Sequence, residues 1–354
     1  MPFEIDYIPV GDGERSGDAI VLRFGNLDGP RNEQKVVVID GGFQKAAENM
    51  IEHVGSYYGT SEVDLVISTH PDFDHISGLN TILENMGVKA LLMHKPWDHA
   101  QEIRGLFRDG RIQANGIGER LEKSLQGASD LEALATRKGI PVYEPFQGDT
   151  AIGGALHVLG PSQGFYEDLL PNFRGLPTPV SVVGAFAPAP VRRAAEQAAQ
   201  WVRDHISLDL LDDDIDSTSA ENNTSTIILL TIDGHKILFT GDAGKTALLQ
   251  AVDYSDGVGV PLTDLRLLDV PHHGSRRNLN SKILKRIQGQ SAFISVAKGS
   301  DKHPSKRVVN ALQKHGMSVY ANCNGTLCHH DETRPTRSKW GNAIREPFHD
   351  LVEE

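Results

Sequence analysis

The sequence predicts a single α/β domain, residues 1–354, built as an αββα sandwich: two mixed β-sheets packed face to face and flanked by helices. Three observations predict this fold. Short apolar, β-branched runs recur along the chain, helical patterns follow many of them, and the runs fall into an N-terminal and a C-terminal block. Two β-rich blocks with helices around them are typical of two packed sheets.

The N-terminal block alternates short apolar runs with glycine-rich turns such as Gly11-Asp12-Gly13. Strands are expected at Glu4–Val10, Ala19–Phe24, Lys35–Asp40, Val63–Ser68 and Val88–His94, with helices at Ala46–Tyr58 and Gly78–Met86. Two helices with charged faces and two short strands follow, at Ile117–Leu125, Leu131–Lys138, Pro141–Tyr143 and Ala155–Leu159.

Residues 165–221 differ in character from both blocks. The stretch is rich in proline, and it then contains a helical pattern at Val191–His205 and the acidic run Leu211–Asp216. We interpret it as an insertion or lid within the domain, over the site. The alternative is a disordered surface excursion.

The C-terminal block is again rich in β-branched residues, and Asp233-Gly234 predicts a hairpin between its first two strands. Strands are expected at Thr226–Thr231, Lys236–Thr240, Leu265–Val270, Ala292–Val296 and Met317–Ala321, and helices at Lys245–Val252 and Ser305–His315.

Potential metal ligands follow several of these strands. The run Thr69–His75 (THPDFDH) holds two histidines and two aspartates directly after the strand that ends at Ser68. Asp242 follows the strand ending at Thr240, and His272-His273 follow the one ending at Val270. Buried charges need partners, and a divalent cation is a natural one for this residue set. Ligands gathered from several strand ends form the open kind of site that catalysis requires.

Seven short motifs occur in order: Gly17-Asp18-Ala19, Ile39-Asp40-Gly41-Gly42, Thr69–His75, Asn223-Thr224-Ser225, Thr240-Gly241-Asp242, His272–Ser275 and His303-Pro304-Ser305. This series resembles the metallo-β-lactamase superfamily and, more closely, the nuclease-like domain of ComEC-type competence proteins. The membrane channel of those proteins has no counterpart here, so the resemblance does not extend to DNA uptake.

The resemblance implies one or two divalent metal ions, Zn²⁺ or Mn²⁺. His70 and Asp72 would bind the first ion. Asp74 and His75 would bind the second, together with His272 or His273, and Asp242 would bridge both.

The chain departs from the superfamily pattern at two positions of the first ion's site. Asp72 replaces the usual second histidine, and the third histidine is absent, which leaves Glu221 or Asn222 as further candidate ligands and His94 as a spare one. Oxygen-rich sites favour harder ions such as Mn²⁺ or Mg²⁺ over Zn²⁺, and they suit anionic substrates.

Other motif residues have expected roles beside the metals. Asp74, Asp18 and His303 are candidates for catalysis, the histidine as a proton donor to a leaving alkoxide. An equal alternative for Asp18 is a residue that stabilises a turn, and an equal alternative for His303 is a surface histidine. Positioning of ligands or contact with substrate is expected for Asp40, Asn223, Ser225, Ser275 and Lys298.

These residues predict a metal-dependent hydrolase, most simply a phosphodiesterase or nuclease in which a metal-activated hydroxide attacks the phosphodiester of a nucleic acid or nucleotide. Two alternatives stay open. One is a hydrolase of the same fold that acts on a lactone, thioester or β-lactam carbonyl. The other is a non-catalytic metal-binding scaffold or sensor.

Composition limits the binding partners and the cellular location that we expect. A net charge of -12 argues against broad nucleic-acid affinity, although Arg276-Arg277 and Lys302–Arg307 are local basic stretches. There is no apolar run of ~20 residues and no signal-like N-terminus, so we expect a cytoplasmic protein without a membrane segment. The two cysteines, Cys323 and Cys328, lack a second Cys/His pair at zinc-finger spacing, and the resemblance to the ComEC-type domain implies a strand and turn there.

Overall fold

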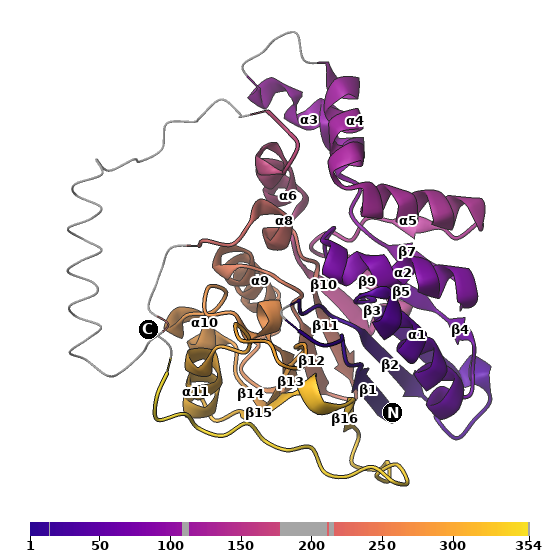
Figure 1. Ribbon diagram of the computed structural model, residues 1–354, viewed down its shortest axis with the longest axis vertical. Helices are drawn as coiled ribbons and strands as arrows, with labels where there is room; N and C mark the ends of the chain where they lie inside the picture. The colour runs from indigo at the N-terminus through magenta and orange to yellow at the C-terminus, as the bar shows by residue number, and fades with distance from the viewer. Residues whose placement is uncertain (14, 108–112, 178–210, 212–215, 353–354) are drawn as a thin grey trace, which may run out of the picture.

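The computed structural model describes residues 1–13, 15–107, 113–177, 211 and 216–352. Two seven-stranded sheets form its centre, and helices cover both outer faces (Figure 1). The αββα architecture predicted from the sequence is confirmed. Most of the predicted insertion, including the helix expected at Val191–His205, lies outside the described residues.

The two sheets are built from strands that pair largely within each half of the chain. The first sheet runs in the order β16 (Leu327–His330), β1 (Phe3–Tyr7), β2 (Ile20–Gly25), β3 (Gln34–Ile39), β5 (Leu65–Ile67), β7 (Leu91–Leu92) and β8 (Val142–Tyr143). The second runs β15 (Ser318–Ala321), β14 (Gly289–Ile294), β13 (Leu265–Asp269), β12 (His235–Phe239), β11 (Ile227–Ile232), β10 (Leu156–Gly160) and β9 (Thr150–Ala151). A small separate sheet pairs β4 (Glu62–Val63) with β6 (Gly87–Val88).

Parallel pairing within each sheet brings the polar loops together. In the first sheet β3, β5, β7 and β8 are parallel, and in the second β12, β13, β14 and β15 are parallel. The carboxyl ends of parallel strands lie at the same edge of a sheet. Asp40, the run Thr69–His75, Asp242, the pair His272-His273 and His303 all follow strands of this kind.

Apolar side chains fill three layers. Phe3, Ile228 and Phe239 belong to the layer between the two sheets. The outer layer of the first sheet is covered by α1 (Gln44–His53), α2 (Phe73–Asn85), α4 (Ala114–Ser124) and α5 (Gln126–Arg137). The outer layer of the second sheet is covered by α9 (Lys245–Gly257), α10 (Ser281–Arg286) and α11 (Lys306–Lys314). Shorter helices are α3 (Ala100–Ile103), α6 (Gln163–Leu169) and α8 (Ala220–Asn223).

Several elements differ from the sequence prediction; strand β9 and helices α6 and α10, for example, were not predicted. Helix α2 begins at Phe73 rather than Gly78, because Asp72 takes the extended N-cap conformation and Asp74 lies in the first turn, where the helix dipole favours an acid. Two of the predicted ligands, Asp74 and His75, therefore lie on a helix and not in a turn. Strand β16 lies where a strand and turn were expected near Cys328, but its pairing with β1 is remote in sequence and was not predicted.

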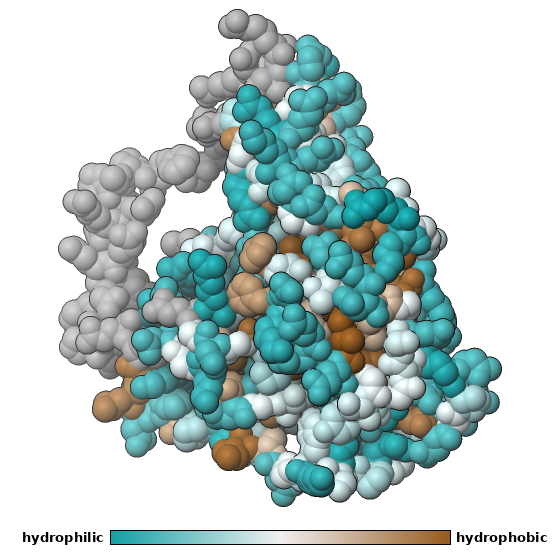
Figure 2. Space-filling view, turned by 45° about the vertical axis from the view of Figure 1, so that its right-hand side comes forward, coloured by the Kyte–Doolittle hydropathy of each residue, from teal (hydrophilic) through white to brown (hydrophobic). Residues whose placement is uncertain are grey.

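The surface agrees with the acidic composition. The face shown in Figure 2 is mostly hydrophilic, and its hydrophobic side chains form separate patches near the middle. Among the residues that the structure describes, no helix has the length and apolar character needed to cross a bilayer.

Candidate metal centre

The carboxylate of Asp242 lies between four imidazoles. Its Oδ2 atom is 3.8 Å from Nε2 of His70 and 3.5 Å from Nε2 of His272. Its Oδ1 atom is 3.4 Å from Nε2 of His75 and 3.8 Å from Nε2 of His273. The two oxygens thus divide the imidazoles into two pairs, and each histidine of the His272-His273 dipeptide belongs to a different pair.

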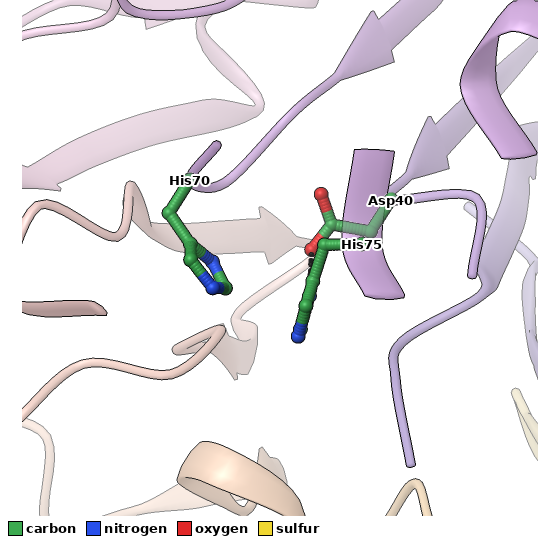
Figure 3. A group of neighbouring side chains, drawn as sticks. All are labelled: Asp40, His70 and His75. Atoms are coloured by element: carbon green, nitrogen blue, oxygen red, sulfur yellow. Dashed lines mark hydrogen bonds and ion pairs between the residues drawn. The ribbon is translucent and has the colours of Figure 1, made fainter. Parts of the chain in front are cut away.

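The two aspartates of the Thr69–His75 run complete these pairs. Asp72 Oδ2 lies 3.9 Å from Nε2 of His70, and Asp74 Oδ2 lies 4.0 Å from Nε2 of His273. The rings of His70 and His75 project from different elements toward the same space (Figure 3). These distances form two groups, one of His70, His272 and Asp72 and the other of His75, His273 and Asp74, with Asp242 between them.

Several atoms at this point are buried without a partner. His70 Nε2, His75 Nε2, His273 Nε2 and Asp242 Oδ1 form no hydrogen bond, and none of these residues is more than 4% exposed. Each unsatisfied buried polar group costs about 1–3 kcal/mol. A cation placed among them would satisfy all of these atoms, and imidazole and carboxylate are ligands of Zn²⁺ and Mn²⁺. The residues present therefore fit one or two divalent ions.

Two buried aspartates orient the imidazoles from behind. Asp40 Oδ2 lies 2.8 Å from Nδ1 of His75 and accepts a 2.6 Å hydrogen bond from Thr69 Oγ1, while its Oδ1 accepts one from Thr69 N. Asp18 lies 3.8 Å from Nδ1 of His75 and 3.5 Å from Nδ1 of His273. Both acids hold the Nε2 atoms toward Asp242. Asp18, expected as a catalytic candidate, also has a carboxylate oxygen within 4.8 Å of ligand atoms of His75 and Asp242.

The C-terminal ligands are held by side-chain amides and a hydroxyl. Asn278 Oδ1 lies 3.1 Å from Nδ1 of His272, and its Nδ2 donates to the backbone carbonyl of Asp242 at 3.0 Å. Asn222 Nδ2 donates to Asp242 Oδ2 at 3.1 Å, and Ser225 Oγ accepts from Asp242 N at 3.1 Å. No sequence motif predicts Asn278; an amide five residues after the histidine pair is its only signal.

The backbone takes an uncommon form at the histidine pair. His272 and His273 have φ values of 52° and 56°, in the left-handed region, which costs on the order of 1–2 kcal/mol per residue. Such strain is typical of functional sites.

A close contact between two glycines fixes the position of α2. A Cβ atom on Gly78 would lie 2.1 Å from the carbonyl oxygen of Gly41, so only glycine lets the helix approach the Asp40 loop this closely.

Charges within the centre shift its protonation equilibria. Burial alone would raise the pKa of Asp242, but His272, His75 and His273 hold it well below its ordinary value. Burial opposes protonation of His273, but Asp242 and Asp18 raise its pKa to about 9. Metal ligands must be deprotonated, so binding of a cation here releases protons.

Two predicted candidates for the first ion lie elsewhere. His94 stacks on Tyr166, with ring centroids 4.5 Å apart, and burial lowers its pKa to about 3. Glu221 Oε1 accepts a hydrogen bond from the backbone N–H of Arg174 at 2.8 Å. Both contacts place these side chains in the structure around the centre rather than at Asp242.

Three further predicted residues do not reach the ligand atoms. Asn223 Nδ2 donates to Thr218 O at 3.5 Å, and Ser275 Oγ accepts from Arg277 N at 3.3 Å. Lys298 is exposed and is not among the residues that line the pocket at the centre. Of the polar motif residues expected to order ligands, Asp40 and Ser225 are the ones in direct contact with them.

An open pocket of about 600 Å³ lies over the centre. Asp72, Asp74, His272 and His273 line it, and so does His303. Burial, and then the neighbouring His273 and His272, lower the pKa of His303 to about 4. This shift favours the neutral form of the His303 imidazole.

Arg15 and Arg174 bring positive charge to this pocket. Arg174 Nη1 donates to Asp72 Oδ1 at 2.7 Å, and its side chain is 48% exposed. Arg174 comes from the described part of the segment interpreted as an insertion, and no motif predicts it. Its contact with Asp72 spans 102 residues of sequence, so only the folded chain reveals it.

Comparison with known proteins agrees with this arrangement. A family model described as the metallo-beta-lactamase superfamily matches residues 13–297, which contain every ligand candidate named above. ComE operon protein 3 of Bacillus subtilis (strain 168) is 27% identical over 111 residues, which cover 31% of this chain and 14% of that protein. This chain therefore matches a small part of that relative's length.

Solved structures are also similar to the chain. Unliganded yeast PDE1 gives a TM-score of 0.44 at 13% identity, covering 92% of this chain and 98% of that one. CmlA, a diiron beta-hydroxylase from Streptomyces venezuelae, gives 0.44 at 13% identity, covering 92% and 54%.

Proposed function

Because the chain belongs to the metallo-β-lactamase superfamily, whose members are mostly metal-dependent hydrolases, we propose that it hydrolyses phosphodiester bonds in a nucleic acid or nucleotide. The observation that carries the proposal is the pocket at the metal centre, which joins acid and imidazole ligands to two arginines, Arg15 and Arg174. Guanidinium groups bind phosphate oxygens through paired, charge-assisted hydrogen bonds.

The ligand atoms suggest two adjacent cation positions that share Asp242. His70, Asp72 and His272 would hold one ion, and Asp74, His75 and His273 the other. Zn²⁺ and Mn²⁺ are both compatible with these ligands. When bound, such ions lower the pKa of coordinated water and neutralise charge that develops on the phosphoryl oxygens.

The chain's own residues supply orientation and charge. Asp40 and Asn278 fix the tautomers of His75 and His272 through their Nδ1 atoms. Arg174 is placed to bind a phosphate oxygen beside Asp72. His303, in its neutral form, offers one ring N–H to a leaving oxygen as a hydrogen bond, without donating a proton as an imidazolium does.

The preference for a phosphodiester over a carbonyl substrate rests on the first ligand group. Asp72 stands where the superfamily pattern has a histidine, so two carboxylates, those of Asp72 and Asp242, accompany the two imidazoles of this group. Harder ions with carboxylate ligands favour anionic oxygen substrates. A neutral lactone or thioester offers Arg174 no anionic oxygen beyond the carboxylate of Asp72, which it already contacts.

The test is turnover with defined metal content. Purified protein is freed of metal, reloaded with Mn²⁺ or Zn²⁺, and offered bis(p-nitrophenyl) phosphate, single-stranded DNA and a lactone. Phosphodiester turnover that disappears in Asp74→Ala and persists in the surface variant Asp253→Asn supports the proposal. Lactone turnover alone, or bound metal without any turnover, contradicts it.

A further inference from the structure

An exposed aromatic side chain lies within the ligand run itself. Phe73 is 63% exposed, although it stands between Asp72 and Asp74 in the first turn of α2. Burial of a phenylalanine side chain is worth about 1.5–3 kcal/mol, so packing does not explain a phenylalanine at this position. A contiguous exposed apolar patch rimmed by polar residues, rather than a single side chain, marks a ligand-binding groove or an interface.

A second phenylalanine lies beside it. The ring centroids of Phe43 and Phe73 are 6.1 Å apart with an interplanar angle of 55°, and both residues line the pocket over the metal centre. Phe43 is the N-cap residue of α1, so the two rings come from the starts of neighbouring helices. Together they form an aromatic surface, which we call the Phe43–Phe73 platform.

Positively charged side chains lie next to this platform. Arg174 bonds to Asp72, the residue directly before Phe73, and its exposed side chain faces the same pocket. Arg15 lines the pocket as well. The pocket therefore combines a surface for a planar ring, guanidinium groups for an anion, and the metal-type ligands, in a volume of about 600 Å³.

We propose, on the basis of the function proposed above, that this pocket selects a nucleotide unit with an unpaired base. The base stacks on the Phe43–Phe73 platform, and Arg174 binds the phosphodiester next to it. Stacking on an aromatic side chain contributes about 1–3 kcal/mol per base and tolerates any base. A base inside a duplex is not free to stack in this way, so the substrate is a single strand or a strand end.

The experiment compares two strands that differ only in their bases. Protein loaded with Mn²⁺ is titrated by calorimetry with a thymidine pentanucleotide joined by phosphorothioate linkages, and with the same backbone carrying abasic tetrahydrofuran units. The wild-type protein is expected to bind the base-bearing strand about tenfold more tightly, as one stacked base predicts. Phe73→Ala is expected to abolish this preference without changing affinity for the abasic strand, and Phe73→Trp to restore it.

Arg174 gives the complementary result. Arg174→Gln is expected to weaken binding of both strands by the same factor, because it removes a contact to the backbone and not to the base. Phe348→Ala, at a 53% exposed phenylalanine outside the pocket, serves as the matched control and should leave both affinities unchanged. Metal content measured on each variant shows whether substitution beside Asp72 and Asp74 has disturbed the centre.

Two results would overturn the proposed stacking of a base on the Phe43–Phe73 platform. One is equal affinity of the wild-type protein for the two strands. The other is a Phe73→Ala variant that loses affinity for both strands equally at full metal content. Absence of phosphodiester turnover by the metal-loaded protein instead overturns the proposed function, and the base-versus-abasic comparison remains readable in that case. A dinucleotide that binds as tightly as the pentanucleotide assigns the pocket to a strand end or free nucleotide. A dinucleotide that binds at least tenfold more weakly than the pentanucleotide assigns the pocket to a longer single strand.

Discussion

Two separate buried clusters of charged side chains are satisfied in different ways. At the first, the outer cluster, Arg337 donates to Asp6 at 2.7 Å and to Glu4 at 2.9 Å, while Tyr58 donates to Asp6 at 2.6 Å. Arg23 donates to Glu4 at 2.8 Å. At the second, the candidate metal centre, the buried aspartates Asp40 and Asp242 face imidazoles and neutral donors, and ring nitrogens and a carboxylate oxygen are left without a partner.

The difference lies in the kind of positive group. Arginine is always charged, and several guanidinium hydrogens neutralise an acid within the chain. Histidine is a ligand when neutral, so a cluster of histidines and aspartates is completed by an ion from outside. Burial and acidity alone therefore do not mark a metal site; unpartnered Nε2 atoms facing a shared carboxylate do.

The largest effect is expected where that shared carboxylate is lost. Asp242→Asn removes the negative charge that faces all four imidazoles, so metal affinity and turnover should fall together. Metal-dependent stabilisation of a transition state is worth several kcal/mol, which corresponds to a loss of about 10³-fold or more in kcat/KM. Elemental analysis and phosphodiester turnover measure the two effects.

Asp253→Asn is the matched control for this prediction, since Asp253 is a surface acid paired with Arg286. It should leave metal content and rate unchanged. An Asp242→Asn protein that keeps a full complement of metal and wild-type turnover would falsify the idea that the two ligand groups share this residue.

The outer cluster should respond in stability and not in metal binding. Arg337→Ala leaves the buried acids Asp6 and Glu4 with one cation fewer, and breaking a buried ion pair costs about 3–5 kcal/mol. Urea unfolding measures the loss. Arg286→Ala, at an exposed pair, is the control and should cost no more than about 1 kcal/mol.

The same cluster predicts a pH dependence. Burial alone would raise the pKa of Asp6, but hydrogen bonds from His53 and Arg337 outweigh it and lower the pKa below the ordinary 3.8. An acid whose pKa is lower in the folded state than in the unfolded state stabilises the fold at pH values above its unfolded-state pKa. This stabilisation is lost as the pH falls through the folded-state pKa. The acid-unfolding midpoint should therefore move to higher pH in Arg337→Ala. An unchanged midpoint would show that Asp6 does not depend on this arginine.

A smaller effect is expected at the acid that orients His75. Asp40→Asn keeps the shape of the side chain but removes its charge, and loss of such a partner typically costs 10–100-fold in metal affinity or activity. Competition with a chelator measures the affinity. The control is Asp64→Asn, a buried acid that pairs with Arg31 and Lys89 away from the centre. It should destabilise the fold and leave metal affinity intact; equal losses in both variants would contradict a specific role for Asp40.

The sequence predicts those parts of the site that are contiguous in the chain and placed by parallel strands. His70 and His75 follow β5 of the first sheet, and Asp242 and the histidine pair follow β12 and β13 of the second, so each group comes from the ends of parallel strands within its own sheet. Arg174 and Asn278 were not predicted, since their partners are remote or their spacing is not a known motif. Local patterns report the ends of strands well, and they contain little information on which loop folds back over them.

The smallest effect is expected at the cysteine pair, which resembles a zinc ligand set in sequence only. Both thiols are free, and Cys328 lies on β16 opposite Asp6 in the outer cluster. Burial, and then the charge of Asp6, raise the pKa of the Cys328 thiol, whereas a zinc ligand must be a thiolate. Cys328→Ser should therefore leave the metal content of the purified protein unchanged and alter its unfolding free energy by less than about 1 kcal/mol. Loss of one equivalent of metal from this variant would instead place a second cation beside the outer cluster, and the contrast between the two clusters would then fail.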